Sequence, residues 1–241
     1  KKIGGLTIGE KAIISACFGR GVYLCGDFVS ASKMKFALQS LGYNVEIISC
    51  GREVEEENDP NLFPFSCAVA KFLDKKVDYL IFLPSSMTTK FNLKKLKEKF
   101  ILNKTNFYDL EEVCNILVSF GYERADYVNI EGQFALRGDI LDIFLFGDDT
   151  PCRVEFFDED IERIIKFETS SMKTLKELDF VEILPLKLEF GLDNVSALCE
   201  NLIIDEPIKI QNECDILTES RKNLSWVKED MFAKFSDLKK E

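Results

Sequence analysis

The clearest pattern in the chain is a long run of aromatic and branched residues between Gln133 and Phe157, broken by a turn cluster at 147–151. Such residues on both sides of Gly, Asp and Pro positions predict an antiparallel hairpin. Side chains on a strand alternate between its faces. Arg153, Glu155 and Phe157 therefore share a face that should be solvated. The residues predicted to share the opposite, buried face are Cys152, Val154 and Phe156.

The leading strand of this hairpin alternates Phe134 and Leu136 with Arg137, and Gly138 permits a bulge that shifts the alternation. Arg137 is then predicted to face outward as well. The residues that would return to the buried side are Leu141, Ile143 and Leu145. Two arginines and a phenylalanine on one small exposed surface have the composition of a protein interface. The alternative is that Phe157 turns into a second core and the arginines are ordinary surface charges.

Residues 1–86 alternate between two kinds of segment. Strand-like stretches at 22–25, 45–49 and 79–83 are separated by segments of helical periodicity at 8–18, 30–41 and 65–72, with Thr7 and Ser30 as candidate caps. Strand and helix in alternation predict a parallel sheet covered by helices on both faces, an α/β fold.

Such sheets often bind nucleotides through a glycine-rich phosphate loop. Neither G-x-x-x-x-G-K-[ST] nor G-x-G-x-x-G follows any predicted strand. The segment NLIIDEP near the end of the chain resembles a magnesium-binding strand, but without a phosphate loop its carboxylates, Asp205 and Glu206, have no triphosphate to serve. A strand-end carboxylate that caps a helix over 208–238 accounts for them better, and we expect no cofactor or metal.

Residues 88–104 are rich in lysine and could form a basic patch for DNA, running from Lys90 to Lys104. The spacing favours a short solvated helix, with Leu93 and Leu96 inward, that leads into a strand at 100–102. Asp109 is then placed to cap a helix over 110–119 that ends at Gly121.

A third strand, over 161–167, follows the hairpin, and together they predict a small antiparallel meander backed by that helix, hence a second, α+β module. Residues 181–184 would lead back towards the parallel sheet.

Composition narrows the range of functions. With 241 residues and 46% hydrophobic content the chain suits one large domain or two small ones. Its net charge of −11 disfavours binding of nucleic acid. No apolar run is long enough to span a membrane, and no signal peptide is evident, so we expect a cytoplasmic protein. The eight cysteines form no CxxC pair and are expected to be reduced thiols that fill core space, while the absence of histidine weakens most hydrolase hypotheses.

Three blocks carry a family resemblance: GYERADYVNIEGQFALRGDILDIF at 121–144, RVEFFDEDIERIIKFE at 153–168, and VEILP at 181–185. In this order and spacing they resemble the second domain of UvrB and the matching domain of Mfd, the bacterial transcription-repair coupling factors. These families carry the module as an insert in a helicase-like sheet. The resemblance implies a degenerate helicase-like sheet from residues 1–86 and 182–241, with the inserted module at 87–181.

The missing phosphate loop decides between the two families. UvrB has an ATP site and a long aromatic hairpin that probes damaged DNA, whereas this chain has a short acidic loop from Gly51 to Asn61. The chain therefore resembles the N-terminal UvrB-like region of Mfd, which implies no ATPase activity of its own. The alternative is an enzyme or nucleotide-binding protein built on the parallel sheet.

In both families the inserted domain docks UvrA. By motif, the resemblance assigns UvrA contacts to Arg137, Arg153 and Phe157, and Glu155 would orient the arginines or meet a basic group. The implied role is recruitment of UvrA by imitation of UvrB. In the full-length protein, other domains would engage RNA polymerase and translocate on DNA, and its own C-terminal domain would mask this surface.

Overall fold

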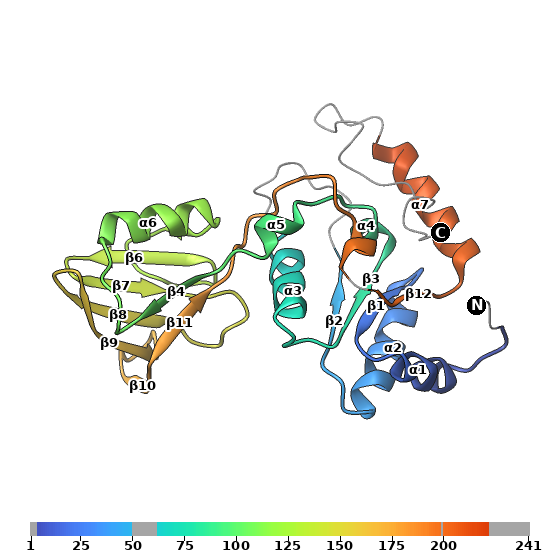
Figure 1. Cartoon of the computed structure of the whole chain (residues 1–241), viewed down its shortest axis with the longest axis horizontal. Helices are drawn as coiled ribbons and strands as arrows, with labels where there is room; N and C mark the ends of the chain where they lie inside the picture. The colour runs from blue at the N-terminus through green and yellow to red at the C-terminus, as the bar shows by residue number, and fades with distance from the viewer. Residues whose placement is uncertain (1–3, 50–61, 199, 222–241) are drawn as a thin grey trace. The chain divides into compact units, whose positions relative to one another are not determined.

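The computed structural model describes residues 4–49, 62–198 and 200–221, and it divides into two compact units (Figure 1). Unit 1 comprises residues 1–97 and 188–241, and unit 2 comprises residues 98–187. Unit 2 thus begins at Glu98 and ends at Lys187, where the resemblance placed the module at 87–181. The loop predicted at 51–61 and the end of the helix predicted to reach residue 238 lie outside the described residues.

Unit 1 is an α/β unit built on a parallel sheet. In chain order its elements are α1 (Ile8–Cys17), β1 (Gly21–Leu24), α2 (Phe28–Ser40), β2 (Val45–Ile48), α3 (Phe63–Leu73), β3 (Tyr79–Phe82), α4 (Pro84–Met87), α5 (Leu93–Leu96), the 3-10 helix η2 (Val195–Ala197), β12 (Leu202–Ile204) and α7 (Pro207–Arg221). The strands lie in the order β12-β1-β3-β2, and every pair is parallel. The predicted parallel sheet is confirmed, and the NLII segment supplies its fourth strand.

Helices cover both faces of this sheet. On one face, Ala12 of α1 and Met34 of α2 pack with Tyr23, Tyr79 and other buried strand residues. On the other, Phe65 of α3 and Ile210 of α7 belong to a cluster that includes the buried side chains of β1, β2 and β3. A parallel sheet buried on both sides requires nearly continuous apolar strands, and β1 and β3 are buried at every position.

Two helix starts in residues 1–86 were predicted from capping residues, and one of them was misplaced. Thr7 caps α1 in a capping box with Glu10, as expected. α2, in contrast, is capped by Asp27 and not by Ser30. Asp27 has extended backbone geometry and accepts a hydrogen bond from the Ser30 backbone N–H at 2.8 Å, whereas Ser30 lies within the first turn of the helix.

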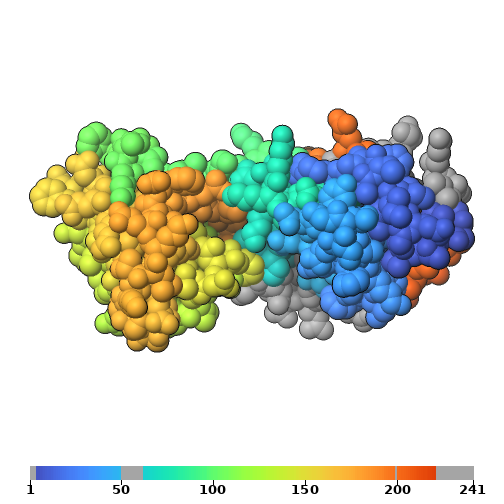
Figure 2. Space-filling view, turned by 90° about the horizontal axis from the view of Figure 1, so that it is seen from below, coloured from blue at the N-terminus to red at the C-terminus, as the bar shows by residue number. Residues whose placement is uncertain are grey.

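Unit 2 is mainly antiparallel. Its elements are β4 (Phe100–Asn103), α6 (Leu110–Ser119), β5 (Glu123–Arg124), β6 (Gln133–Arg137), β7 (Ile140–Ile143), β8 (Cys152–Phe157), β9 (Asp160–Phe167), β10 (Thr174–Leu178) and β11 (Phe180–Ile183). Six strands form a sheet in the order β10-β9-β8-β7-β6-β5, and β11 pairs with β4 in a separate ribbon. Among the described strands of this unit, only the short β5 runs parallel to its neighbour, β6. The segment that includes β10 and β11 is orange in the space-filling view (Figure 2).

The predicted hairpin contains one strand more than expected. Gly138, at φ +59°, lies in a two-residue turn that joins β6 to β7, because Arg137 pairs directly with Ile140. The expected bulge at Gly138 is therefore wrong. β7 ends at Ile143, so Leu145 lies beyond the strand and is only half-buried. A register shift does occur, between β8 and β9 at Glu155 and Phe156.

The segment after the sheet also differs from expectation. Residues 181–184 were predicted to lead back towards the parallel sheet, but β11 pairs antiparallel with β4, with Val181 opposite Leu102. Asp109 caps α6 as predicted, and Val113 and Leu117 provide its buried stripe. In the lysine-rich segment, Asn92 caps α5 and Leu96 is buried, as the helical interpretation requires.

Most of the cysteines that the structure describes are buried. Cys25, Cys67, Cys114, Cys152 and Cys214 are buried and form no disulfide within the described residues. Burial raises the pKa of Cys25, Cys114 and Cys152, which disfavours the reactive thiolate. Cys17 is an exception to the prediction, because its side chain is exposed; Cys50 and Cys199 lie outside the described residues. In the described ranges, no helix combines the length and apolar character needed to cross a membrane.

Candidate protein-interaction face

One face of the six-stranded sheet, here called the outer face, collects the charged residues singled out in the sequence. Strand pairing places Asp142 opposite Arg153, and the neighbouring row runs from Arg137 through Ile140 to Glu155. Directly paired residues project from the same side of a sheet. Along β8 the other side, at Cys152, Val154 and Phe156, is buried. The predicted alternation of β8 is therefore confirmed.

The centre of the outer face is a carboxylate that both arginines share. Arg153 donates from Nε to Asp142 Oδ1 at 2.7 Å and from Nη2 to Oδ2 at 2.9 Å, a two-bond contact. Arg137 donates from Nη2 to the same Oδ2 at 2.5 Å. The Asp142 side chain is only 2% exposed, against 14% for Arg153 and 31% for Arg137. One buried anion thus fixes two cations that still reach the surface.

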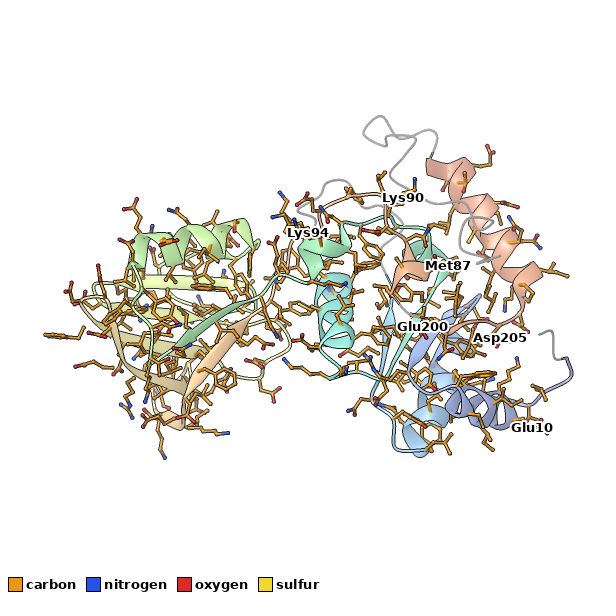
Figure 3. The ribbon with its side chains drawn as sticks, viewed as in Figure 1. Glu10, Met87, Lys90, Lys94, Glu200 and Asp205 are labelled. Carbon is orange, nitrogen blue, oxygen red and sulfur yellow. The ribbon has the colours of Figure 1, made fainter. Side chains whose placement is uncertain are left out.

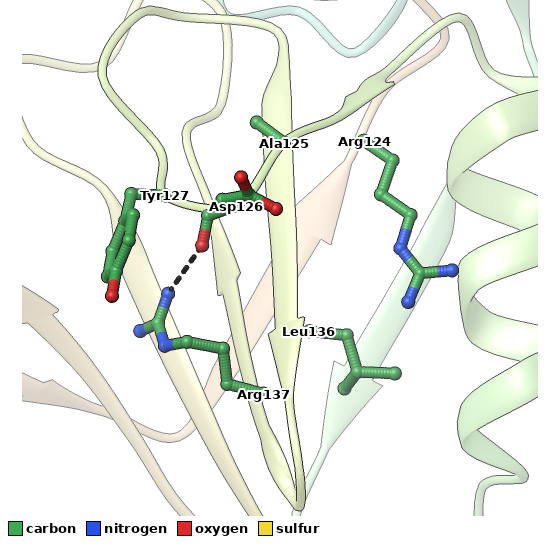
Figure 4. Close-up of a pocket in the computed structure, with 6 residues that line it drawn as sticks. All are labelled: Arg124, Ala125, Asp126, Tyr127, Leu136 and Arg137. Atoms are coloured by element: carbon green, nitrogen blue, oxygen red, sulfur yellow. Dashed lines mark hydrogen bonds between the residues drawn. The ribbon is translucent and has the colours of Figure 1, made fainter.

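Aromatic rings hold each guanidinium from a second direction. The Arg153 guanidinium lies 4.6 Å from the centre of the Phe167 ring, and that of Arg137 lies 4.9 Å from the Tyr127 ring. Arg137 also donates to the backbone carbonyl of Asp126 (Figure 4). Hydrogen bonds to Asp142 raise the pKa of Arg153, so this side chain stays charged at every physiological pH. Both guanidinium groups are thereby held in place before any partner arrives.

Phe157 differs from the arginines because the protein leaves it uncovered. It is the last residue of β8, opposite Asp160 across a tight turn, and its side chain is 70% exposed. Glu155 is half-buried in the row with Arg137. The second core proposed as an alternative for Phe157 does not cover it. A large exposed apolar side chain beside oriented cations is suited to binding another protein.

Asp142 is the important residue that sequence reasoning missed. A signal was present, because an aspartate between Leu141 and Ile143 interrupts an otherwise apolar strand. An acidic residue at such a position is buried only when it is paired. Its position opposite Arg153 is set by the pairing of β7 with β8, and its approach to Arg137 by the turn at Gly138, which the predicted bulge concealed.

A hollow adjoins the outer face at the β5 edge of the sheet. It is lined by Arg124, Ala125, Asp126, Tyr127, Leu136 and Arg137. Figure 4 shows Arg137 and Tyr127 together on one side of β6 and Leu136 on the other. The Tyr127 ring is 62% exposed, so the surface next to Arg137 is partly aromatic.

In unit 1, the connection between β1 and α2 is too short for a phosphate loop. Such a loop would follow β1 and precede α2, where this chain has only Cys25, Gly26 and Asp27. The Asp27 carboxylate caps α2 and accepts a hydrogen bond from Lys209. The lysine side chain also lies against Gly26, so that a Cβ there would come within 3.0 Å of it. The N-terminus of α2 is therefore capped by an internal carboxylate, which is itself paired with Lys209.

Asp205 also has an internal partner at this end of the sheet. It follows β12 (Figure 3) and accepts a hydrogen bond from Lys11 Nζ at 2.7 Å. This ion pair was not foreseen when Asp205 was considered as a helix cap. Burial and the nearby Asp205 carboxylate raise the pKa of Tyr23. In the described ranges, no group of three Cys, Asp or Glu side chains is arranged to hold a metal ion.

Substitution Asp27→Ala should lower the free energy of unfolding by about 1 kcal/mol at pH 7, a typical cost for losing an N-cap. The hydrogen bond from Lys209 and that from Ser30 lower the pKa of Asp27 in the folded state. Its contribution is therefore complete above the unfolded-state pKa of about 3.9 and is lost progressively as pH falls from there through the lowered folded-state pKa. Urea unfolding from pH 7 to pH 3 measures this, and the difference between the two proteins should shrink on acidification. Asp27→Asn keeps the cap without the charge, and a difference as large at pH 3 as at pH 7 would contradict the assignment.

Comparison with known proteins finds relatives of this chain, and the matching family model covers unit 2. Residues 100–188 match the family model described as the UvrB interaction domain. The chain is 38% identical over 80 residues to the transcription-repair-coupling factor of Escherichia coli (strain K12), covering 33% of this chain and 7% of that protein. It is 44% identical over 76 residues to UvrABC system protein B of Kosmotoga olearia, covering 32% and 11%.

A longer match joins the chain to the transcription-repair-coupling factor of Helicobacter pylori, at 34% identity over 125 residues, 52% of this chain and 12% of that protein. These matches span only about a tenth of each relative. The structural boundaries of unit 2, 98 and 187, nearly coincide with the matched residues 100–188. Unit 2 matches the UvrB interaction domain over nearly its whole length, and the chain resembles the UvrB-like region of bacterial transcription-repair-coupling factors.

Proposed function

We propose that this chain recruits UvrA, and that it does so through the outer face of unit 2 at Arg137, Arg153, Glu155 and Phe157. The observation that carries the proposal is the pair of arginines fixed on Asp142 next to an exposed Phe157. The match of unit 2 to the UvrB interaction domain supports a role in nucleotide excision repair. Mimicry of UvrB explains why one module recurs in UvrB proteins and in coupling factors.

Binding would use a prearranged surface. A guanidinium has several N–H donors in a planar fork, and the contacts with Asp142 leave others that can reach a carboxylate or carbonyl of UvrA. Because Asp142 and the two rings already fix the arginines, little side-chain entropy is lost on binding. Phe157 would insert into an apolar pocket of UvrA and provide the buried centre of the interface.

We also propose that this chain is part of a larger protein. The chain would be the N-terminal part of a coupling factor in which unit 1 is a degenerate helicase-like sheet and unit 2 is its inserted module. Other domains would displace stalled RNA polymerase and move on DNA, and a C-terminal domain would mask the outer face until it is needed. This chain would then bring UvrA to the lesion without consuming ATP.

We further propose that unit 1 does not bind ATP, and two features of the β1–α2 connection support this. The sequence has no phosphate loop after β1, and Asp27 and Lys209 occupy the corresponding position at α2. A phosphate placed there would meet the charge of the Asp27 carboxylate, whose lowered pKa keeps it ionised.

Two titrations of the purified chain test the proposal. Calorimetry with purified UvrA should show saturable binding that competes with UvrB, because both would use the same surface of UvrA. Titration with fluorescently labelled ATP and Mg²⁺ should show no saturable binding. A chain that binds ATP tightly and ignores UvrA would support the competing hypothesis of a nucleotide-binding α/β protein.

A further inference from the structure

A second exposed aromatic residue lies on the same side of the sheet as Phe157. Phe107 forms an isolated antiparallel bridge with Asp160, and Asp160 also pairs with Phe157. The three residues form one row across the sheet, so all three project from one side. Two strand spacings place the two phenylalanine backbones roughly 10 Å apart. No feature of the sequence had singled out Phe107.

The protein holds Phe107 in place but does not cover it. The neighbouring Tyr108 donates its backbone N–H to the Glu159 carbonyl at 2.8 Å, and its hydroxyl donates to the Ile101 carbonyl at 3.0 Å. The Tyr108 ring also packs edge-on against Phe100. Phe107, one residue earlier, is 73% exposed. The hydrogen-bonded local backbone thus presents an apolar ring to solvent. Burial of this ring by a partner would be favourable, because it removes apolar surface from water.

The surroundings of the two rings are acidic. Asp160 lies between them, and the turn residues Asp158 and Glu159 are exposed beside it, as is Glu162. The arginine pair lies in other rows of the sheet, so the preference for a basic partner is confined to this end, at Asp158, Glu159 and Asp160. The net charge of the whole chain, −11, also favours a basic partner.

We infer that Phe107 and Phe157 form one apolar slot, with Asp160 at its floor, that takes a segment of UvrA carrying an apolar side chain next to a lysine or arginine. This inference rests on the proposed function and extends the contact surface to residues outside the motif. The apolar side chain fits between the rings, and its basic neighbour meets Asp160. UvrA would therefore contact both the arginine pair and this slot.

The test measures UvrA binding by the intact chain carrying Phe107→Ala. We expect affinity to fall about tenfold or more, as for a well-packed interface anchor. Phe36→Ala is the matched control, because Phe36 is also 73% exposed but lies on α2 in unit 1. Asp160→Asn should lower affinity by a smaller factor, with its largest effect at low salt.

A double variant identifies the slot itself. If both rings hold one UvrA side chain, Phe107→Ala combined with Phe157→Ala should lose less affinity than the product of the two single losses. Loss with Phe157→Ala but parental affinity with Phe107→Ala would overturn the slot and leave the proposed function intact. Independent, fully multiplicative losses would overturn the shared slot. Failure of the parent chain to bind UvrA at all would overturn both.

Discussion

Substitution Phe157→Ala should weaken UvrA binding by about 2–4 kcal/mol, roughly 30- to 700-fold, the range of an interface anchor. The ring is 70% exposed in the free chain, so its removal leaves no cavity and exposes no core. Its whole effect should therefore appear in the complex and not in folding. Few positions allow this separation, because most residues that matter for binding also support the fold.

Calorimetric titration of UvrA into the parent and the variant measures the loss, and urea unfolding checks that stability changes by less than about 0.5 kcal/mol. Phe36→Ala in unit 1 controls for loss of an exposed ring. Parental affinity in the Phe157 variant would remove this residue from the proposed site. Arg153→Ala should cost a similar amount of affinity, but it also deprives the buried Asp142 of two hydrogen bonds.

The second large effect is expected at Asp142. Substitution Asp142→Ala should destabilise the chain by about 3 kcal/mol, since it leaves the largely buried Arg153 without its counterion. Arg137 loses the same partner but is more exposed, so it contributes less. UvrA binding should fall as well, because neither guanidinium keeps its orientation. The loss occurs although Asp142 has too little exposed surface for a direct contact with UvrA.

Urea unfolding and UvrA titration of the same variant give both quantities. Asp139→Ala is the matched control, because Asp139 lies in the exposed turn between β6 and β7, three residues away. It should stay within about 0.5 kcal/mol of the parent. A stable Asp142 variant that binds UvrA normally would show that the arginines need no anchor.

The sequence predicted architecture well where a single periodicity dominated. The alternation of β8 placed Arg153, Glu155 and Phe157 on one side correctly because burial changes at every residue of that strand. The parallel sheet of unit 1 followed from alternating strand and helix signals. In both cases the period of burial reports directly which side of the element meets the core.

The sequence was less informative where one residue can serve two purposes. Gly138 suits a bulge or a tight turn equally well, and only the pairing of Arg137 with Ile140 distinguishes them. Asp27 and Ser30 are both good caps, and the choice depends on where the chain leaves β1. The shared role of Asp142 and the row that includes Phe107 depend on strand register, which local patterns do not determine.

The pairing of β4 with β11 has a consequence for how the gene can be divided. Phe100 lies opposite Ile183, so the two ends of unit 2 run side by side. On the other side of the boundary, Phe91 bridges Asp193, and Asn92 donates its backbone N–H to the Glu189 carbonyl. Each unit thus closes its own chain ends. The continuous coding segment for unit 2 could therefore be transplanted as a cassette with short joints, and unit 1 could be closed by joining residue 97 to residue 188.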